Sequence, residues 1–210
     1  MTRLEFQISN EDSQFLIDLT RNTIIKYITT HQVITPPPNS PWHLRQPRGV
    51  FVTLTTQQAG EKMLRGCIGY PEPQLPLVEA TISAAISAAT RDPRFPPISI
   101  SELNDILIEV SILTLPSLIN VKKTTDYPQQ ITIGRDGLII ERGMYKGLLL
   151  PQVPIEWNWN AEEFLGHCCE KAGLLSDAWL LPGTKISKFS CILIQENSVQ
   201  QAVTLIDMRK

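Results

Sequence analysis

The irregular order of helical and strand patterns is the feature that most constrains the fold of this chain. Residues 49–55 and 63–70 alternate like two strands of a hairpin, joined by a turn at residues 58–61. Residues 77–90, rich in alanine and isoleucine, follow as a largely buried helix. Because strands and helices do not alternate regularly along the rest of the chain, we predict an α+β protein with mixed or antiparallel sheets and flanking helices rather than a doubly wound fold.

Two further helices and several strands complete the predicted elements. A helix is expected over residues 10–30, capped by Asn10, Asp12 or Ser13, and another over 161–172, from the cap Asn160 to the stop Gly173. Strands are predicted at residues 106–113, 131–134, 138–141, 145–150 and 186–195, of which the middle three form a meander and the last is the final strand.

Composition sets limits on the class of protein. The 210 residues are 42% hydrophobic, enough for one substantial core or for a main core with a satellite. The net charge of −2 argues against direct nucleic-acid binding, which needs clustered basic side chains. No apolar run approaches the roughly 18 residues of a membrane span, and the start lacks an apolar signal core. The four cysteines are few and irregularly spaced, so we expect free thiols in the reducing cytoplasm.

The hexapeptide at residues 64–69 (LRGCIG) is the strongest candidate for a functional site. In a regular strand Arg65 and Cys67 share one face, and a cation beside a thiol lowers its pKa and activates it. Gly66 and Gly69 remove side-chain cover, so a ligand or another backbone can approach closely. The alternative is that Cys67 is a small buried hydrophobic residue, a common fate of free cysteine.

Charged and polar residues elsewhere supply candidate neighbours for Cys67. Arg48 precedes the partner strand, and Asp92 lies between two arginines at a helix end, where it forms either an anion clamp and positioned base or a salt-bridged helix stop. Gln152 is a further candidate for lining the cleft, where its side-chain amide would direct a ligand. The candidate catalytic residues are Cys67, Arg65 and Asp92, and the candidate ligand-binding residues are Arg48, Gly66, Gly69, Arg94 and Gln152.

Histidine and metal chemistry have few candidates. On a helix His167, Cys168 and Cys169 point about 100° apart and do not converge on one ion, so we predict core cysteines, a solvated histidine and no metal site. His43 follows Trp42 in the proline-rich segment 36–47 and is the histidine that we retain as an acid–base candidate. No motif indicates a cofactor.

The hexapeptide, the alanine-rich helix and the following RDPRF sequence at residues 91–95 together resemble the AMMECR family, which takes its name from the chromosomal region of Alport syndrome, midface hypoplasia and elliptocytosis. The likeness covers nearly the whole chain and includes residues 47–52, 133–138, 149–153 and 172–174. It implies a single α+β domain over residues 1–210. A larger subdomain would come from the N- and C-terminal parts, a smaller one from approximately residues 120–155, with a cleft between them.

The resemblance implies little about chemistry, because the activity of the family is not settled. The shared strand face and the glycines of the hexapeptide suggest an enzyme that uses the cleft, and the resemblance implies a modification pathway with Memo-type and radical-SAM proteins as partners. The alternative is a non-catalytic binding module or scaffold for a protein partner. On either hypothesis the ligand is an unidentified small molecule or protein.

Overall fold

The computed structural model describes residues 6–58, 61–199 and 203–209, and its contacts divide the chain into two compact units. Unit 1 comprises Met1–Leu113 and Ile192–Ile206, and unit 2 comprises Thr114–Cys191 and Asp207–Lys210. Unit 1 therefore combines N- and C-terminal segments. Unit 2 begins before the segment 120–155 that we assigned to a smaller subdomain, and it continues well beyond it.

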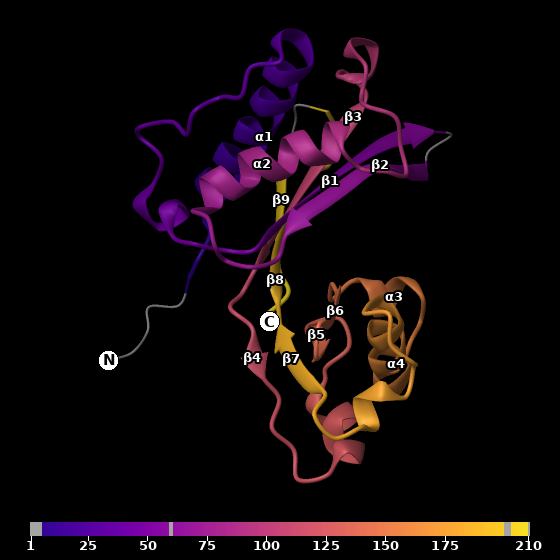
Figure 1. The fold of residues 1–210 in the computed structure, drawn as a ribbon. Helices are drawn as coiled ribbons and strands as arrows, with labels where there is room; N and C mark the ends of the chain where they lie inside the picture. Colours follow the sequence, from indigo (N-terminus) through magenta and orange to yellow (C-terminus); the bar gives the residue numbers. More distant parts are fainter. Residues whose placement is uncertain (1–5, 59–60, 200–202, 210) are drawn as a thin grey trace. The chain divides into compact units, whose positions relative to one another are not determined.

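Unit 1 is built on a five-stranded sheet with two long helices against one face (Figure 1). The strand order is β2-β1-β3-β8-β9, and β1 pairs antiparallel with both β2 and β3. The strands are β1 (Val50–Gln58), β2 (Glu61–Tyr70), β3 (Ile106–Leu113), β8 (Cys191–Glu196) and β9 (Val203–Asp207). The helices are α1 (Asn10–Thr30) and α2 (Leu77–Thr90), with short 3-10 helices η1 (Trp42–Arg45) and η2 (Ile100–Glu102).

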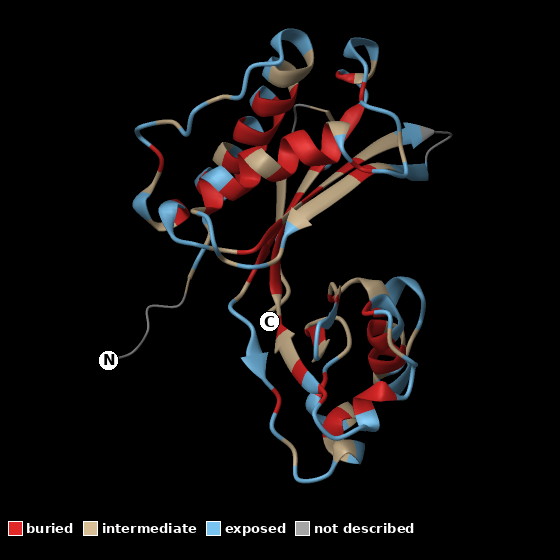
Figure 2. Cartoon of the chain, in the orientation of Figure 1, coloured by how far each residue is buried: buried red, intermediate tan, exposed pale blue. Residues whose placement is uncertain are grey.

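The core of unit 1 lies between this sheet and the two helices. Alternate residues of β1, among them Val50, Val52 and Leu54, are fully buried and pack with the apolar side chains of α1 and α2. Figure 2 shows that α2 is buried along most of its length, as its alanine-rich sequence predicts. The predicted hairpin, α2 and β3 are therefore confirmed, while residues 59–60 of the turn lie outside the described residues.

Unit 2 contains a four-stranded antiparallel sheet and its own core. The strands, in the order β4-β7-β5-β6, are β4 (Ser117–Leu118), β7 (Lys185–Phe189), β5 (Gly137–Arg142) and β6 (Tyr145–Leu149). The helices are α3 (Val153–Glu156) and α4 (Ala161–Lys171), with 3-10 helices η3 (Thr124–Gln130) and η4 (Ala178–Leu180). As predicted, Asn160 caps α4 and Gly173 ends it with a φ of +78°.

The inside of unit 2 confirms the predicted roles of the cysteines on α4. Cys168 and Cys169 are fully buried in its core, whereas the side chain of His167 is 41% exposed and contacts Glu170. All four cysteines of the chain are free thiols. Among the described residues, no helix is both long and apolar enough to cross a membrane.

Several predicted elements were wrong. Residues 131–134 form no strand: the chain turns at residues 133–135, and the carboxylate of Asp136 accepts the Thr132 N–H and closes the loop. The predicted strand 186–195 is two strands in different sheets, separated at Ser190, whose backbone exchanges hydrogen bonds with Thr114. The short β4 and the final β9 were missed. Ser9, rather than Asn10, Asp12 or Ser13, caps α1, in a capping box with Asp12.

Candidate functional site

A bulge in the β1–β2 pair separates the two reactive side chains of the hexapeptide. Leu54 pairs with Gly66 and Thr55 with Leu64, so Arg65 is an extra residue on β2. The bulge interrupts the alternation on which the shared face of Arg65 and Cys67 depends. That expectation was therefore wrong, and the two side chains have different surroundings.

Arg65 is held in a network of its own. Its Nε donates to Glu102 Oε1 at 2.6 Å, and its Nη1 donates to the Pro96 carbonyl at 2.9 Å. Its Nη2 lies 3.3 Å from Glu102 Oε2 and 3.4 Å from the Pro97 carbonyl oxygen. Arg65 in turn lowers the pKa of Glu102 to about 2. All three nitrogens of the guanidinium therefore have protein partners.

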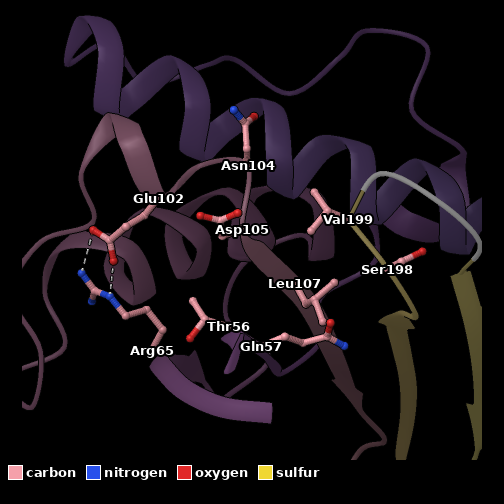
Figure 3. A pocket seen from close by; sticks show the side chains of 9 residues that line it. All are labelled: Thr56, Gln57, Arg65, Glu102, Asn104, Asp105, Leu107, Ser198 and Val199. Carbon is pink, nitrogen blue, oxygen red and sulfur yellow. Dashed lines mark hydrogen bonds and ion pairs between the residues drawn. The ribbon is translucent and has the colours of Figure 1, made fainter. Parts of the chain in front are cut away.

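The Arg65–Glu102 pair forms one side of a polar pocket of about 580 Å³ in unit 1 (Figure 3). The figure shows the pair facing each other, with Asp105 and Asn104 beside them. The lining residues come from β1, β2, η2 and the segment after it, the start of β3 and the segment after β8: Thr56, Gln57, Arg65, Glu102, Asn104, Asp105, Leu107, Ser198 and Val199. Cys67 does not line this pocket, so the hexapeptide contributes to two different places.

Cys67 belongs to a polar row that crosses three strands. It pairs with Thr53 of β1, which pairs in turn with Glu109 of β3. Residues directly opposite each other share one face of a sheet, here the face opposite the buried Val52 and Leu54. The Thr53 hydroxyl donates to Cys67 Sγ at 3.3 Å. We call Cys67, Thr53 and Glu109 the polar row.

Asp92 and Arg94 bind the backbone of Cys67 on the edge strand β2. Asp92 Oδ2 accepts the Cys67 N–H at 2.8 Å, and Arg94 Nη2 lies 3.5 Å from the Cys67 carbonyl oxygen. The Asp92 carboxylate also accepts hydrogen bonds from Nε, Nη2 and the backbone N–H of Arg94. These bonds, led by those from the Arg94 side chain, hold the pKa of Asp92 well below its usual range. The pair supplies one acceptor and one donor where a neighbouring strand would otherwise be.

The electrostatic surroundings of Cys67 keep it as a thiol. Burial is the largest influence and raises the pKa of Cys67, and the charges of Glu109 and Asp92 add to that increase. The Thr53 hydrogen bond and the Arg94 charge act in the opposite direction without reversing it. The expected activation by Arg65 is absent from these influences, and the cation that acts on Cys67 is Arg94.

The two glycines of the hexapeptide are explained by packing within unit 1. A Cβ on Gly66 would lie 2.2 Å from the Ala88 carbonyl oxygen of α2, and one on Gly69 would lie 2.3 Å from the Phe51 ring. Their missing side chains therefore admit a helix backbone and an aromatic ring. Their role in ligand binding stays a prediction.

Arg48 and Gln152 have surroundings of their own. Arg48 donates to the Pro47 carbonyl and lies over the Phe6 ring, in a pocket with Trp42 and His43. Gln152 belongs to unit 2, where its backbone carbonyl accepts N–H groups of α3. Its side-chain Oε1 is buried and has no hydrogen-bond partner among the described residues.

Sequence reasoning missed four residues around these sites: Thr53, Glu102, Glu109 and Ser111. Ser111 lies two residues from Glu109 on the same face of β3, and its buried Oγ lacks a hydrogen-bond partner in the described part of the chain. The signal available was alternation: Glu109 and Ser111 are the polar residues of the otherwise apolar β3, and Thr53 lies between the buried Val52 and Leu54 of β1. Their register with Cys67 required the pairing of three strands.

The fold and these sites define an α+β protein of two units with antiparallel sheets, and the comparisons agree with that class. The sequence profile of the AMMECR1 family matches residues 17–194. The chain therefore belongs to the AMMECR1 family.

Archaeal relatives are similar over almost their whole length. A protein of Thermococcus gammatolerans is 50% identical over 192 residues, covering 91% of this chain and 93% of its own. One of Methanocaldococcus jannaschii is 49% identical over 186 residues, covering 89% and 90%. The crystal structure of an uncharacterized protein from Pyrococcus horikoshii matches with a TM-score of 0.90 and 46% identity, over 95% of this chain and 98% of that one. The names of these relatives state no activity.

Proposed function

We propose that this AMMECR1-family protein is a binding module that recognises a polar small molecule with the polar row, and that Cys67 takes part as a neutral thiol. The observation that carries the proposal is the row itself: a thiol, a hydroxyl and a carboxylate lie side by side on one sheet face. The buried Oγ of Ser111 on the same face, which has no hydrogen-bond partner among the described residues, supports it, because such an atom gains from a ligand hydrogen bond.

The surroundings of Cys67 favour binding over catalysis by a thiolate. Burial raises the pKa of the thiol, whereas a nucleophilic cysteine needs a lowered one. Arg65 is committed to Glu102 and to two carbonyls, and Asp92 is a fully hydrogen-bonded ion with a depressed pKa. A general base at neutral pH needs a higher pKa than that, so Asp92 fits a positioning role. Association with Memo-type and radical-SAM proteins stays a prediction from the resemblance.

Protection of Cys67 from alkylation tests the binding proposal. The low-molecular-weight fraction of a cell extract should slow the reaction of Cys67 with iodoacetamide, measured by mass spectrometry of the Cys67 peptide. Thr53→Val removes the hydroxyl at nearly constant volume and should abolish most of this protection. Thr55→Val, on the same strand and face, is the matched control and should retain it. Equal alkylation with and without the extract would contradict the proposal.

The pH dependence of the same reaction tests the enzyme alternative. Without extract, the midpoint of Cys67 alkylation should lie above the ordinary thiol pKa of 9.0. The other three cysteines are buried, and Cys67→Ser identifies any contribution from them. A midpoint near neutral pH would favour an enzyme that uses Cys67 as a nucleophile.

A further inference from the structure

A second pocket of unit 1 lies beside the start of α1 and does not include any residue of the hexapeptide. Its volume is about 550 Å³. The residues used below are Phe6, Asp12, Trp42, His43, Gln46 and Arg48, all of which line it. We call it the His43 pocket.

The wall that carries Trp42 and His43 is firmly anchored. Leu44, in the same turn of η1, is fully buried in the unit 1 core. The Gln46 carbonyl accepts the N–H of Leu77 at 3.1 Å, which ties the segment to the start of α2. Arg45 donates its Nε to the Ser40 carbonyl at 3.0 Å. The proline-rich segment is therefore an ordered part of a site, and little ordering free energy is needed when a ligand binds.

Arg48 presents a partly buried positive charge to the His43 pocket. Burial lowers the pKa of Arg48, and its Nη1 donates to the Pro47 carbonyl at 2.8 Å. The guanidinium lies 4.4 Å from the centroid of the Phe6 ring. Among the described residues, no carboxylate pairs with Arg48, and Nε and Nη2 have no partner. A desolvated guanidinium with unused donors is suited to a carboxylate or a phosphate.

His43 is held in the pocket wall by a fixed carboxylate. Its Nε2 is buried and lies 3.0 Å from Asp12 Oδ2. Asp12 Oδ2 also accepts the backbone N–H of Ser9 at 2.9 Å and its hydroxyl at 2.8 Å. Burial raises the pKa of Asp12, but the Ser9 bonds and the His43 contact outweigh it and keep the pKa below its ordinary value.

Trp42 adds a broad aromatic surface to the same pocket. Trp42 is 71% exposed to solvent, although an indole is among the side chains that gain most from burial. The ring lies edge-to-face with the His43 imidazole, with centroids 6.2 Å apart. An exposed indole held in place beside a guanidinium that pairs with no carboxylate in the described part of the chain can stack on a planar ring while the cation binds an attached acid.

We propose that the His43 pocket binds a small planar ring that carries one acidic group, with the acid on Arg48 and the ring on Trp42. Two ligand sources share this chemistry: nucleoside monophosphates and aromatic carboxylates. The site uses none of the polar row, so this inference is independent of the proposed function.

Isothermal titration of the full chain with four probes tests the proposal. AMP and indole-3-acetate represent the two sources, adenosine has a ring without an acid, and inorganic phosphate has an acid without a ring. At least one of the first two should bind about tenfold or more tighter than both fragments, and which one binds identifies the source. Arg48→Gln and Trp42→Ala should each weaken that binding by about tenfold or more, which is 1.4 kcal/mol. Arg91→Gln, an exposed arginine on the same unit, is the matched control and should not change it.

Two further variants separate a loss of binding in this pocket from poor folding and from binding at the polar row. Arg48→Lys keeps the charge but loses the planar fork, so its affinity should lie between those of the wild type and Arg48→Gln even if the Gln variant folds poorly. Thr53→Val should bind like the wild type, which distinguishes this pocket from the polar row. The proposal is overturned if neither acid binds at millimolar concentration, or if Arg48→Lys and Arg48→Gln both bind as tightly as the wild type.

Discussion

Asp92 in unit 1 and Asp136 in unit 2 are built alike and serve different purposes. Both are buried, and each binds an arginine close in sequence through two side-chain hydrogen bonds. Asp92 also accepts the N–H of Cys67, 25 residues away, on an edge strand. Asp136 accepts the N–H of Thr132, four residues away, within one loop. The same local motif therefore joins distant elements in one unit and closes a turn in the other.

The difference teaches that an aspartate–arginine pair in a sequence predicts the ion pair but not its target. The RDPR sequence indicated a charged helix stop or an anion clamp, and RDG indicated a turn. The turn interpretation needed only local residues. The bond from Asp92 to Cys67 depends on how β2 packs beside the end of α2, which no local pattern contains.

The largest expected effect comes from Asp92→Asn. The amide keeps one acceptor oxygen but loses the charge and the second acceptor, so Arg94 loses its counter-ion and the bonds from Arg94 and from the Cys67 N–H can no longer all be made. We expect a loss of about 3 kcal/mol in the stability of unit 1. Hydrogen exchange of α2 and β2 amides measures it directly. Tryptophan fluorescence, to which Trp157, Trp159 and Trp179 of unit 2 contribute, provides the control. Unchanged exchange in β2 would mean that Asp92 does not join these elements.

Asp136→Asn should have a smaller effect, confined to unit 2. Its bonds lie within one loop, apart from a 3.4 Å contact with Lys188 Nζ. We expect a loss of about 1.5 kcal/mol, typical of a buried polar group that loses part of its hydrogen bonding. Urea unfolding followed by tryptophan fluorescence measures it. If Asp136→Asn costs as much as Asp92→Asn, the contrast between distant and local bonding has no energetic basis.

Acid should weaken unit 1 through a second carboxylate, Glu102. Its pKa falls from the ordinary 4.5 to about 2 in the folded protein, so the ionised form favours folding. That contribution is complete above pH 4.5 and is lost as the pH falls toward 2. Because the pair is partly exposed, we expect about 1 kcal/mol. Amide protection in unit 1 should therefore decline less steeply over this range in Glu102→Gln. Glu141→Gln, whose partner is the exposed Lys146, is the control variant. The slope of amide protection in unit 1 against pH is measured for it in the same way and serves as the reference.

The fold was predictable where apolar patterns are long and local. The helix α1 was found from its periodicity, α2 and β3 from their apolar composition, and α4 from its cap and stop residues. The single strand that was predicted over 186–195 was wrong because two strands that are consecutive in the sequence join different sheets without a turn motif between them. The break at Ser190 depends on Thr114, which is 76 residues distant.

For the candidate site, the sequence predicted some of the residues that lie together but not the hydrogen bonds and ion pairs between them. The hexapeptide, Asp92 and Arg94 do meet in unit 1, with Asp92 bound to the Cys67 backbone. The bulge at Arg65 could not be inferred, since a single extra residue in β2 leaves the hydrophobic pattern almost unchanged and yet redirects every preceding side chain. Glu102 as the partner of Arg65 was equally hidden, being 37 residues away.

The smallest expected effect concerns the chemistry of Cys67. If the Asp92–Arg94 pair acts on the thiol through charge, Arg94→Gln should raise the pKa of Cys67 further, because it removes the cation that lowers it and leaves Asp92 less neutralised. Alkylation of Cys67 at mildly alkaline pH should slow about twofold, a modest change because the Arg94 side chain is 54% exposed and solvent screens it. Arg135→Gln, the equivalent change beside Asp136, should leave the rate unchanged. Faster alkylation in Arg94→Gln would show that the arginine shields the thiol sterically, and the pair would then act on Cys67 through access instead of charge.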